Sequence, residues 1–249
     1  MSAHTVMRSS RPYEMQNATL DLVDVHRGSL FLRKLPISDL RRMEPCLDVR
    51  EFGRDEAIQS DSNIITRVFF PHNMTLTLLG AVPDGTAVEI ATVGTEGYLG
   101  VESLLGSATA IGIAVSGGGQ ASTIGLEQTL ISTSQMPALH AAMLAYARSY
   151  LVLVFKLAAC NAIHTLKQRT CRRLRLALDQ TEQGAVAMTQ DDLARALGVG
   201  RTSVNQVCKE LRDANLIRYG RGLITINSVA ELTKAARDCY QSLKQILPL

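Results

Sequence analysis

Apolar residues recur at helical spacing in two short stretches near the C-terminal end of the chain, and each set predicts the buried face of one helix. The first set is Leu193, Ala194 and Leu197, and the second is Val204, Val207, Cys208 and Leu211. Thr189 and Asp192 have the spacing of a capping box, and Gly198 suits the left-handed end of a helix. The pattern therefore predicts two helices joined by a turn of about three residues.

Two stretches that follow, 216–219 and 223–226, alternate between apolar and polar residues on either side of Gly220, Arg221 and Gly222. Alternation around a glycine-rich turn predicts a β-hairpin. Two helices followed by a hairpin form a winged helix-turn-helix, whose second helix enters the major groove of DNA.

The polar face of the second predicted helix carries side chains suited to reading DNA. Arg pairs with guanine, Asn and Gln pair with adenine, and Lys contacts phosphate. The predicted DNA-binding residues are Gln190, Arg201, Thr202, Ser203, Asn205, Gln206, Lys209, Arg218 and Arg221. We expect Arg201 to make the strongest base contact, with Thr202 and Gln206 setting the other preferred bases. The alternatives are a solvated polar face and a winged helix that binds protein.

A longer stretch, 137–168, has apolar residues alternately four and three positions apart. The predicted dimer seam consists of Leu139, Met143, Tyr146, Tyr150, Leu153, Leu157 and Cys160. This spacing favours packing against an equivalent helix, hence a parallel homodimer, over a core helix of a single chain. A twofold dimer would place two reading helices on a palindromic operator. We expect no membrane-spanning segment, because Lys156 interrupts the most apolar run.

The N-terminal half has a different pattern, with short alternating or apolar runs separated by turn residues. The runs lie at 68–70, 75–79, 87–93, 111–115 and 121–124. Regular short strands with turn signals predict a small antiparallel barrel or sandwich. We expect a helix at 32–43 before it, and a loose tail over the first twenty-odd residues.

Charge is divided unequally between the two halves of the chain. From residue 165 onward there are 14 Lys and Arg against 8 Asp and Glu, and before it 12 against 15. A basic C-terminal half favours a polyanionic partner such as double-stranded DNA. Five scattered cysteines predict a reducing, cytoplasmic location. No nucleotide-binding loop, metalloprotease pair or nucleophile elbow stands in a matching context, so we expect no enzyme.

Taken in order, these elements make the chain resemble the CRP/FNR family of bacterial transcription regulators from about Ser29 onward. The resemblance rests on TQDDLARALGVGRTSVNQVCKELRDANLI, AACNAIHTLKQRTCRRLRLAL and VGTEGYLGVESLLG, the last two being similar to a proteobacterial subgroup. It implies an α+β chain in which an antiparallel β-roll, or double-stranded β-helix, senses a signal. A long helix dimerises, and the winged helix binds an operator and contacts RNA polymerase in an activator.

The resemblance also implies a division of the chain into four parts. These are a tail over 1–28, a cyclic-nucleotide-binding-like β-roll over 29–134, a dimerisation helix and hinge over 135–168, and a winged helix-turn-helix over 169–249. Best-known members have Arg-Glu-Thr-Val followed by a second Arg in the recognition helix. Here Thr202 and Gln206 replace the Glu and the second Arg, so the operator is expected to differ.

The implied effector pocket departs from the family pattern. Members that respond to cyclic nucleotides hold the ribose with Gly-Glu-Leu and the phosphate with Arg-Ser. The residues implied to line the pocket here are Gly100, Val101, Glu102, Ser122 and Thr123. Val101 takes the place of the Glu, and no Arg lies between residues 101 and 124. A buried phosphate would lack its cation, which is costly, so we expect weak or absent binding of cAMP.

Cysteine positions bear on metal cofactors. Iron–sulfur members hold their cluster with several cysteines near the N-terminus, whereas the first cysteines here are Cys46 and Cys160. A cluster needs four thiolates, so none is expected. Cys160 and His164 lie four residues apart on one helix face and could share a metal. Their positions in the seam favour packing, and the sequence assigns no metal site.

Overall fold

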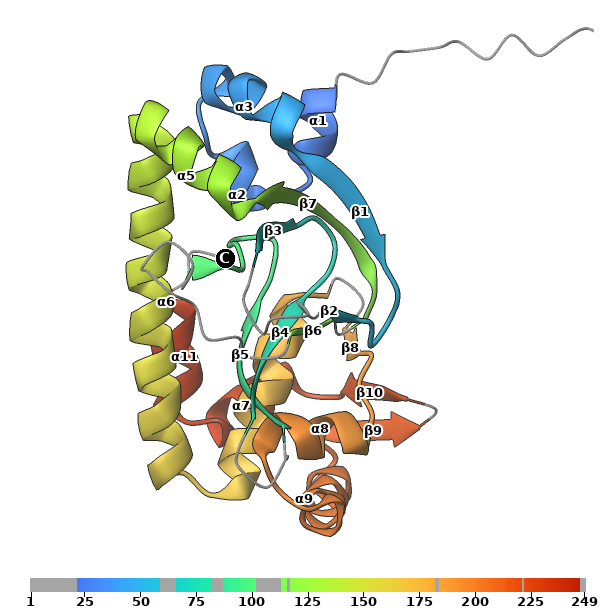
Figure 1. Ribbon diagram of the computed structural model, residues 1–249. Helices are drawn as coiled ribbons and strands as arrows, with labels where there is room; N and C mark the ends of the chain where they lie inside the picture. Colours follow the sequence, from blue (N-terminus) through green and yellow to red (C-terminus); the bar gives the residue numbers. More distant parts are fainter. Residues whose placement is uncertain are drawn as a thin grey trace, which may run out of the picture.

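A β-sheet domain, a long helix along its side and a smaller C-terminal domain make up the chain (Figure 1). The computed structural model describes residues 22–58, 66–81, 87–101, 113–115, 117–181, 184–220 and 222–246. Two predicted site residues, Glu102 and Arg221, lie outside the described residues, as does the chain before residue 22.

Short helices precede the sheets: α1 (Leu22–His26), α2 (Leu30–Arg33), α3 (Ile37–Met43) and the 3-10 turn η1 (Glu44–Cys46). Ser29 caps α2 by accepting a hydrogen bond from the Leu32 backbone N–H. Val23 and His26 are buried. The expectation of a loose tail therefore fails for residues 22–28, where two buried side chains were too few to produce a readable period.

Within the described ranges, seven strands form two antiparallel sheets, as the sequence predicted. The first sheet has the order β1-β7-β3 and consists of β1 (Asp48–Phe52), β3 (Arg67–Pro71) and β7 (Gly119–Gly125). The second has the order β2-β6-β4-β5 and consists of β2 (Ala57–Ile58), β4 (Leu76–Ala81), β5 (Ala87–Val93) and β6 (Ile113–Val115). The register between β4 and β5 shifts at Leu78 and Leu79.

Aromatic rings tie the sheets to the helices. The ring of Tyr98 lies 5.1 Å from that of Phe31 and 5.0 Å from that of Tyr146, measured between centroids. The Tyr98 hydroxyl donates a 2.9 Å hydrogen bond to the carbonyl of Met143. Such edge-on and tilted ring pairs add about 0.5–1.5 kcal/mol each to the burial of their apolar surface. The β-roll and the long helix therefore share one core.

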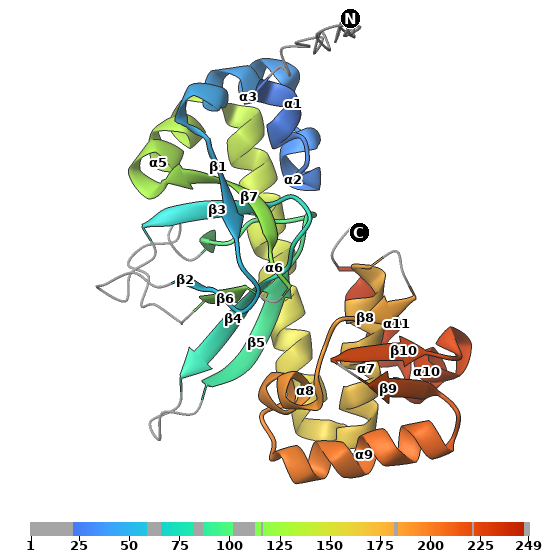
Figure 2. The same cartoon turned by 90° about the vertical axis from the view of Figure 1, so that its right-hand side faces the viewer.

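The long helix is α6 (Pro137–Ile163), which follows α5 (Leu126–Gln135). It has 27 residues and is long and apolar enough to cross a membrane, a criterion that core helices of soluble proteins also meet. In this fold α6 begins beside the β-roll and ends beside α7 and α11 of the C-terminal domain (Figures 1 and 2).

The predicted dimer seam needs correction, because most of it packs inside the chain. Five of its members are no more than 8% exposed: Leu139, Met143, Tyr146, Tyr150 and Leu153. They belong to the β-roll core, and Leu157 packs against it. Cys160 is half-buried. The 4-3 spacing marks the face that α6 turns to its own sheet domain.

The C-terminal domain contains the predicted pair of helices followed by a hairpin, together with further elements on either side. Its elements are α7 (Leu166–Asp179), β8 (Ala185–Val186), α8 (Gln190–Leu197), α9 (Arg201–Asp213), β9 (Ile217–Gly220), β10 (Leu223–Ile226), α10 (Val229–Ala235) and α11 (Asp238–Lys244). The strands form a sheet in the order β8-β10-β9. Thr189 and Asp192 form the predicted capping box, and Gly198 ends α8 at φ 62°. The winged helix-turn-helix is confirmed.

Candidate nucleic-acid interface

Helix α9 is held in place by one apolar stripe. Val204, Cys208 and Leu211 are 0% exposed, and Val207 is 7% exposed. They pack with Leu193 and Leu197 of α8 in the core of the C-terminal domain. Because that stripe faces inward, the remaining faces of α9 are turned outward.

The outward faces of α9 carry most of the predicted DNA-binding residues. Arg201, Thr202, Ser203, Gln206 and Lys209 are exposed, and Asn205 is half-buried. In Figure 2, α9 lies along the lower rim of the molecule. The N-terminal turns of this helix are therefore accessible to a large partner.

The charged groups on this face are held by weak, solvent-exposed contacts. The Nε atom of Arg201 lies 3.1 Å from Oδ1 of Asp191, and the two side chains are 66% and 56% exposed. An exposed pair of this kind is worth about 0–1 kcal/mol. Gln206 donates a long 3.4 Å hydrogen bond to Glu210. Arg201 and Gln206 can therefore exchange these partners for a ligand at small cost.

Two other predicted residues lie beside α9 rather than on it. Gln190, half-buried at the start of α8, hydrogen-bonds the Cys208 thiol and so supports the contact between the two helices. Arg218 is exposed on β9 of the hairpin. The structure adds Lys167 of α7, whose ammonium lies 3.6 Å from Glu210 of α9. Sequence reasoning missed this cation because it precedes the helix-turn-helix pattern.

The β-roll contacts the helix-turn-helix directly. Arg54 donates a 3.2 Å hydrogen bond to the carbonyl of Ala187, just before α8. A Cβ added at Gly198 would lie 3.0 Å from Cγ1 of Val88 on β5. Gly198 is therefore favoured by its positive φ, and a side chain at this position would also crowd Val88.

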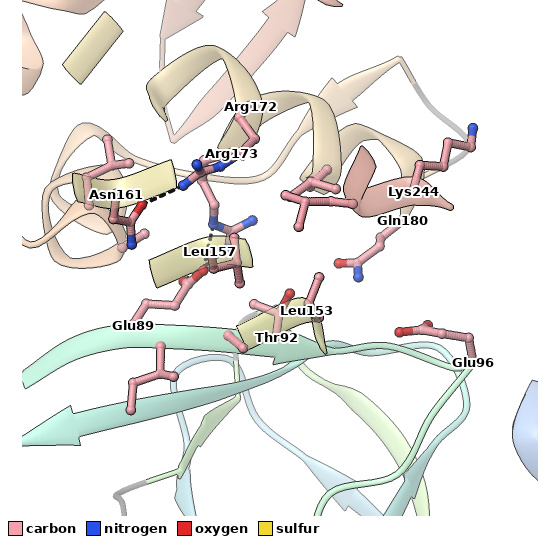
Figure 3. A pocket seen from close by; sticks show the side chains of 16 residues that line it. Glu89, Thr92, Glu96, Leu153, Leu157, Asn161, Arg172, Arg173, Gln180 and Lys244 are labelled. Atoms are coloured by element: carbon pink, nitrogen blue, oxygen red, sulfur yellow. Dashed lines mark hydrogen bonds and ion pairs between the residues drawn. The ribbon is translucent and has the colours of Figure 1, made fainter. Parts of the chain in front are cut away.

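A cleft lies where β5 meets α6, α7 and α11 (Figure 3). The Arg173 guanidinium makes two contacts with the Glu89 carboxylate across it, at 2.8 Å and 3.1 Å. Arg172, only 5% exposed, donates to Asn161 Oδ1 at 2.7 Å. Of the residues predicted to form an effector pocket, the four that the structure describes, Gly100, Val101, Ser122 and Thr123, do not line this cleft.

The described members of the predicted effector pocket are packed against other parts of the chain. Val101 is 7% exposed, and Gly100 has a φ of 109°. Thr123 Oγ1 accepts hydrogen bonds from Nε and Nη2 of Arg67, at 3.3 and 2.8 Å. Ser122 Oγ lies 2.7 Å from Nδ1 of His26 and 2.7 Å from Nε2 of His72. An effector site at these residues stays a prediction.

The two histidines around Ser122 resist protonation. Burial lowers the pKa of His72 to about 4, and the nearby His26 adds to the effect. Burial also lowers the pKa of His26, against the attraction of Glu44 and Asp48. Both rings are therefore neutral at physiological pH, when each can exchange a hydrogen bond with Ser122.

We expect the β-roll to lose stability as the pH falls from about 6.5 toward 4. Over that range the unfolded chain binds a proton at His72 that the folded chain excludes, so the free energy of unfolding decreases. The slope from one such group is at most about 1.4 kcal/mol per pH unit. Urea denaturation at several pH values measures it. His72→Gln should flatten the slope and His140→Gln, on an exposed position of α6, should not; equal slopes in both variants would contradict the assignment.

A family model matches the C-terminal part of the chain. Residues 168–235 match the family model of the Crp-like helix-turn-helix domain. No curated protein sequence matches the chain.

Solved structures resemble the chain over most of its length. A CRP-family transcriptional regulator from Thermus thermophilus has a TM-score of 0.62 at 22% identity, covering 75% of this chain and 96% of that one. The c-di-GMP responsive global regulator CLP from Xanthomonas campestris has a TM-score of 0.65 at 14% identity, covering 78% and 100%. A protein from Eubacterium rectale assigned to the crp/fnr family has a TM-score of 0.67 at 13% identity, covering 85% and 99%. Over 75–85% of its length, the chain thus has the fold of these solved structures.

Proposed function

We propose that this chain, which has the CRP/FNR fold and a Crp-like helix-turn-helix domain, is a sequence-specific transcription regulator that binds a palindromic operator as a cytoplasmic homodimer. The observation that carries the proposal is α9, whose polar N-terminal turns face solvent while its apolar stripe is buried. Arg201, Thr202 and Gln206 contact base edges, and Lys209 and Arg218 contact phosphates. The chain is not an enzyme in this proposal.

The homodimer uses the face of α6 that points away from the β-roll. A second set of positions on this helix, also alternately three and four apart, is exposed in every member: Ala141, Leu144, Arg148, Leu151, Phe155, Ala158 and Ala162. Leu144, Leu151 and Phe155 are 47%, 52% and 64% exposed. Apolar side chains repeated in this way favour pairing with the same helix of a second copy.

Selection of bound sequences from a random duplex pool tests the proposed function. The purified protein is used at moderate salt, alone and with cAMP or cGMP. A twofold-symmetric site in every arm supports a dimeric regulator that needs neither nucleotide. Enrichment only with cAMP would contradict the expectation of weak cAMP binding. Absence of enrichment in all arms, together with an affinity for DNA that does not fall as salt rises, would contradict DNA binding itself.

Arg201→Ala is expected to weaken operator binding by about 1–3 kcal/mol, or roughly 5- to 150-fold, and to relax the preference at one base position. The reason is the loss of a two-point contact with guanine. Arg218→Ala is the matched control, because loss of a phosphate contact lowers the affinity for all sequences and reduces the salt slope by about one. Competition binding with single-base operator variants distinguishes the two. An unchanged base preference in Arg201→Ala would reject its role.

A further inference from the structure

Three metal-binding side chains meet where the long helix ends. Cys160 lies in the last turn of α6, His164 is the residue that ends this helix, and Cys239 belongs to α11. Their ligand atoms all lie within 4.8 Å of one another. The Sγ atom of Cys239 is 3.2 Å from Nδ1 of His164 and 3.9 Å from its Nε2. Cys239 is separated from His164 by 75 residues in the sequence, so the group is assembled only by the fold.

The chemistry and spacing of this group suit a zinc ion. Zinc binds thiolate at about 2.3 Å and imidazole nitrogen at about 2.0–2.1 Å in tetrahedral geometry, which places neighbouring ligand atoms about 3.5–3.8 Å apart. The two distances between Cys239 and His164, 3.2 and 3.9 Å, bracket those values, and the Cys160 sulfur lies within 4.8 Å of both partners. Small side-chain rotations would complete the site. All three residues are half-buried, so an ion can reach the group from solvent.

We propose that Cys160, His164 and Cys239 bind one Zn²⁺ ion, which joins the end of α6 to α11. The sequence pattern alone identifies only two candidate ligands, Cys160 and His164, and their positions favour packing over metal binding. The fold adds Cys239 as a third ligand, which favours metal binding instead. Two thiolates and one imidazole are a ligand set that selects zinc over calcium and magnesium, which prefer oxygen.

The site lies where the C-terminal domain contacts α6 and the β-roll. Leu243 of α11 is buried in the same core as α6 and the β-roll, and Lys156 of α6 donates a hydrogen bond to Ser242 of α11. On its other side α11 packs on α7, where the Tyr240 hydroxyl donates a 2.6 Å hydrogen bond to Asp179. Figure 1 shows α11 between α6 and α7. Zinc would therefore fix the C-terminal domain relative to α6. If the chain binds an operator as proposed above, zinc would thereby regulate operator affinity.

Cobalt titration of the full-length, reduced protein tests the metal site without DNA. One equivalent of Co²⁺ per chain should produce the thiolate charge-transfer and tetrahedral d–d absorption bands, and Zn²⁺ should displace it. Cys239→Ser and Cys160→Ser, on different helices, should each weaken binding by roughly 100-fold or more, while Cys46→Ser in η1 should leave it unchanged. Far-UV circular dichroism confirms that each variant folds.

Three results would overturn the proposal. The first is absence of the cobalt bands in reduced protein, and the second is unchanged binding in both cysteine variants. The third is that Cys160 and Cys239 form a disulfide with each other and that the protein binds no metal after this disulfide is reduced. Operator affinity with and without zinc is then compared in the unmodified protein and in Cys239→Ser. A metal site that binds cobalt but leaves operator affinity unchanged would refute the regulatory role alone.

Discussion

Replacing both Leu151 and Phe155 with Asp is expected to convert the dimer into monomers and to lower operator affinity by at least about 100-fold. The two side chains lie on the outward stripe of α6 and are 52% and 64% exposed in the single chain. In the proposed dimer they are covered by the same stripe of the second copy. An uncompensated charge buried in this way costs about 3–5 kcal/mol. Because the dimer is twofold symmetric, each substitution is present in both subunits. A monomer then binds one half-site without the contribution of the other.

The fold of the single chain should survive this change, since neither side chain belongs to its core. Light scattering during size-exclusion chromatography gives the mass, and binding to the selected operator gives the affinity. Ile37→Asp with Val49→Asp is the matched control, because these residues are 50% and 39% exposed on α3 and β1. A dimer that persists in Leu151→Asp with Phe155→Asp would show that α6 does not form the interface.

The sequence predicts that α6 exists but not which of its faces is outward. Both the inward stripe that begins at Leu139 and the outward stripe that includes Phe155 have the 4-3 spacing. A helix with apolar residues on nearly every side carries no periodic signal that distinguishes its own core from a partner. Only the position of the β-roll, set by contacts such as Tyr98 with Tyr146, determines that the first stripe is buried.

The helix-turn-helix was predictable because its signals are local. The two members of the capping box, Thr189 and Asp192, are three positions apart, and Gly198 marks the turn by its own backbone preference. The interactions that escaped prediction join distant parts of the chain. His26 and Ser122 are 96 residues apart, and Arg173 and Glu89 are 84 apart. Pairs of this kind depend on the arrangement of whole domains, which no short pattern encodes.

Removing the carboxylate of the Glu89 and Arg173 ion pair is expected to lower the stability of the protein strongly. Its side chains are 12% and 11% exposed, and the carboxylate meets the guanidinium at two points. Glu89→Ala leaves the charge of Arg173 in the cleft without its partner, so we expect the free energy of unfolding to fall by about 3 kcal/mol. The contact between β5 and α7 also weakens, which loosens the C-terminal domain against the β-roll.

A second variant distinguishes two causes of the lost stability, the unpaired charge of Arg173 and the loss of its attraction to Glu89. Replacing both residues, Glu89→Leu with Arg173→Met, removes the two charges together and keeps apolar volume in the cleft. Because a buried ion pair is often worth no more than well-packed apolar groups, this variant should recover most of the lost stability. Urea denaturation followed by far-UV circular dichroism measures all three proteins. If Glu89→Ala were as stable as the unmodified protein, water would have to reach Arg173 freely, and the pair could not hold the two domains together.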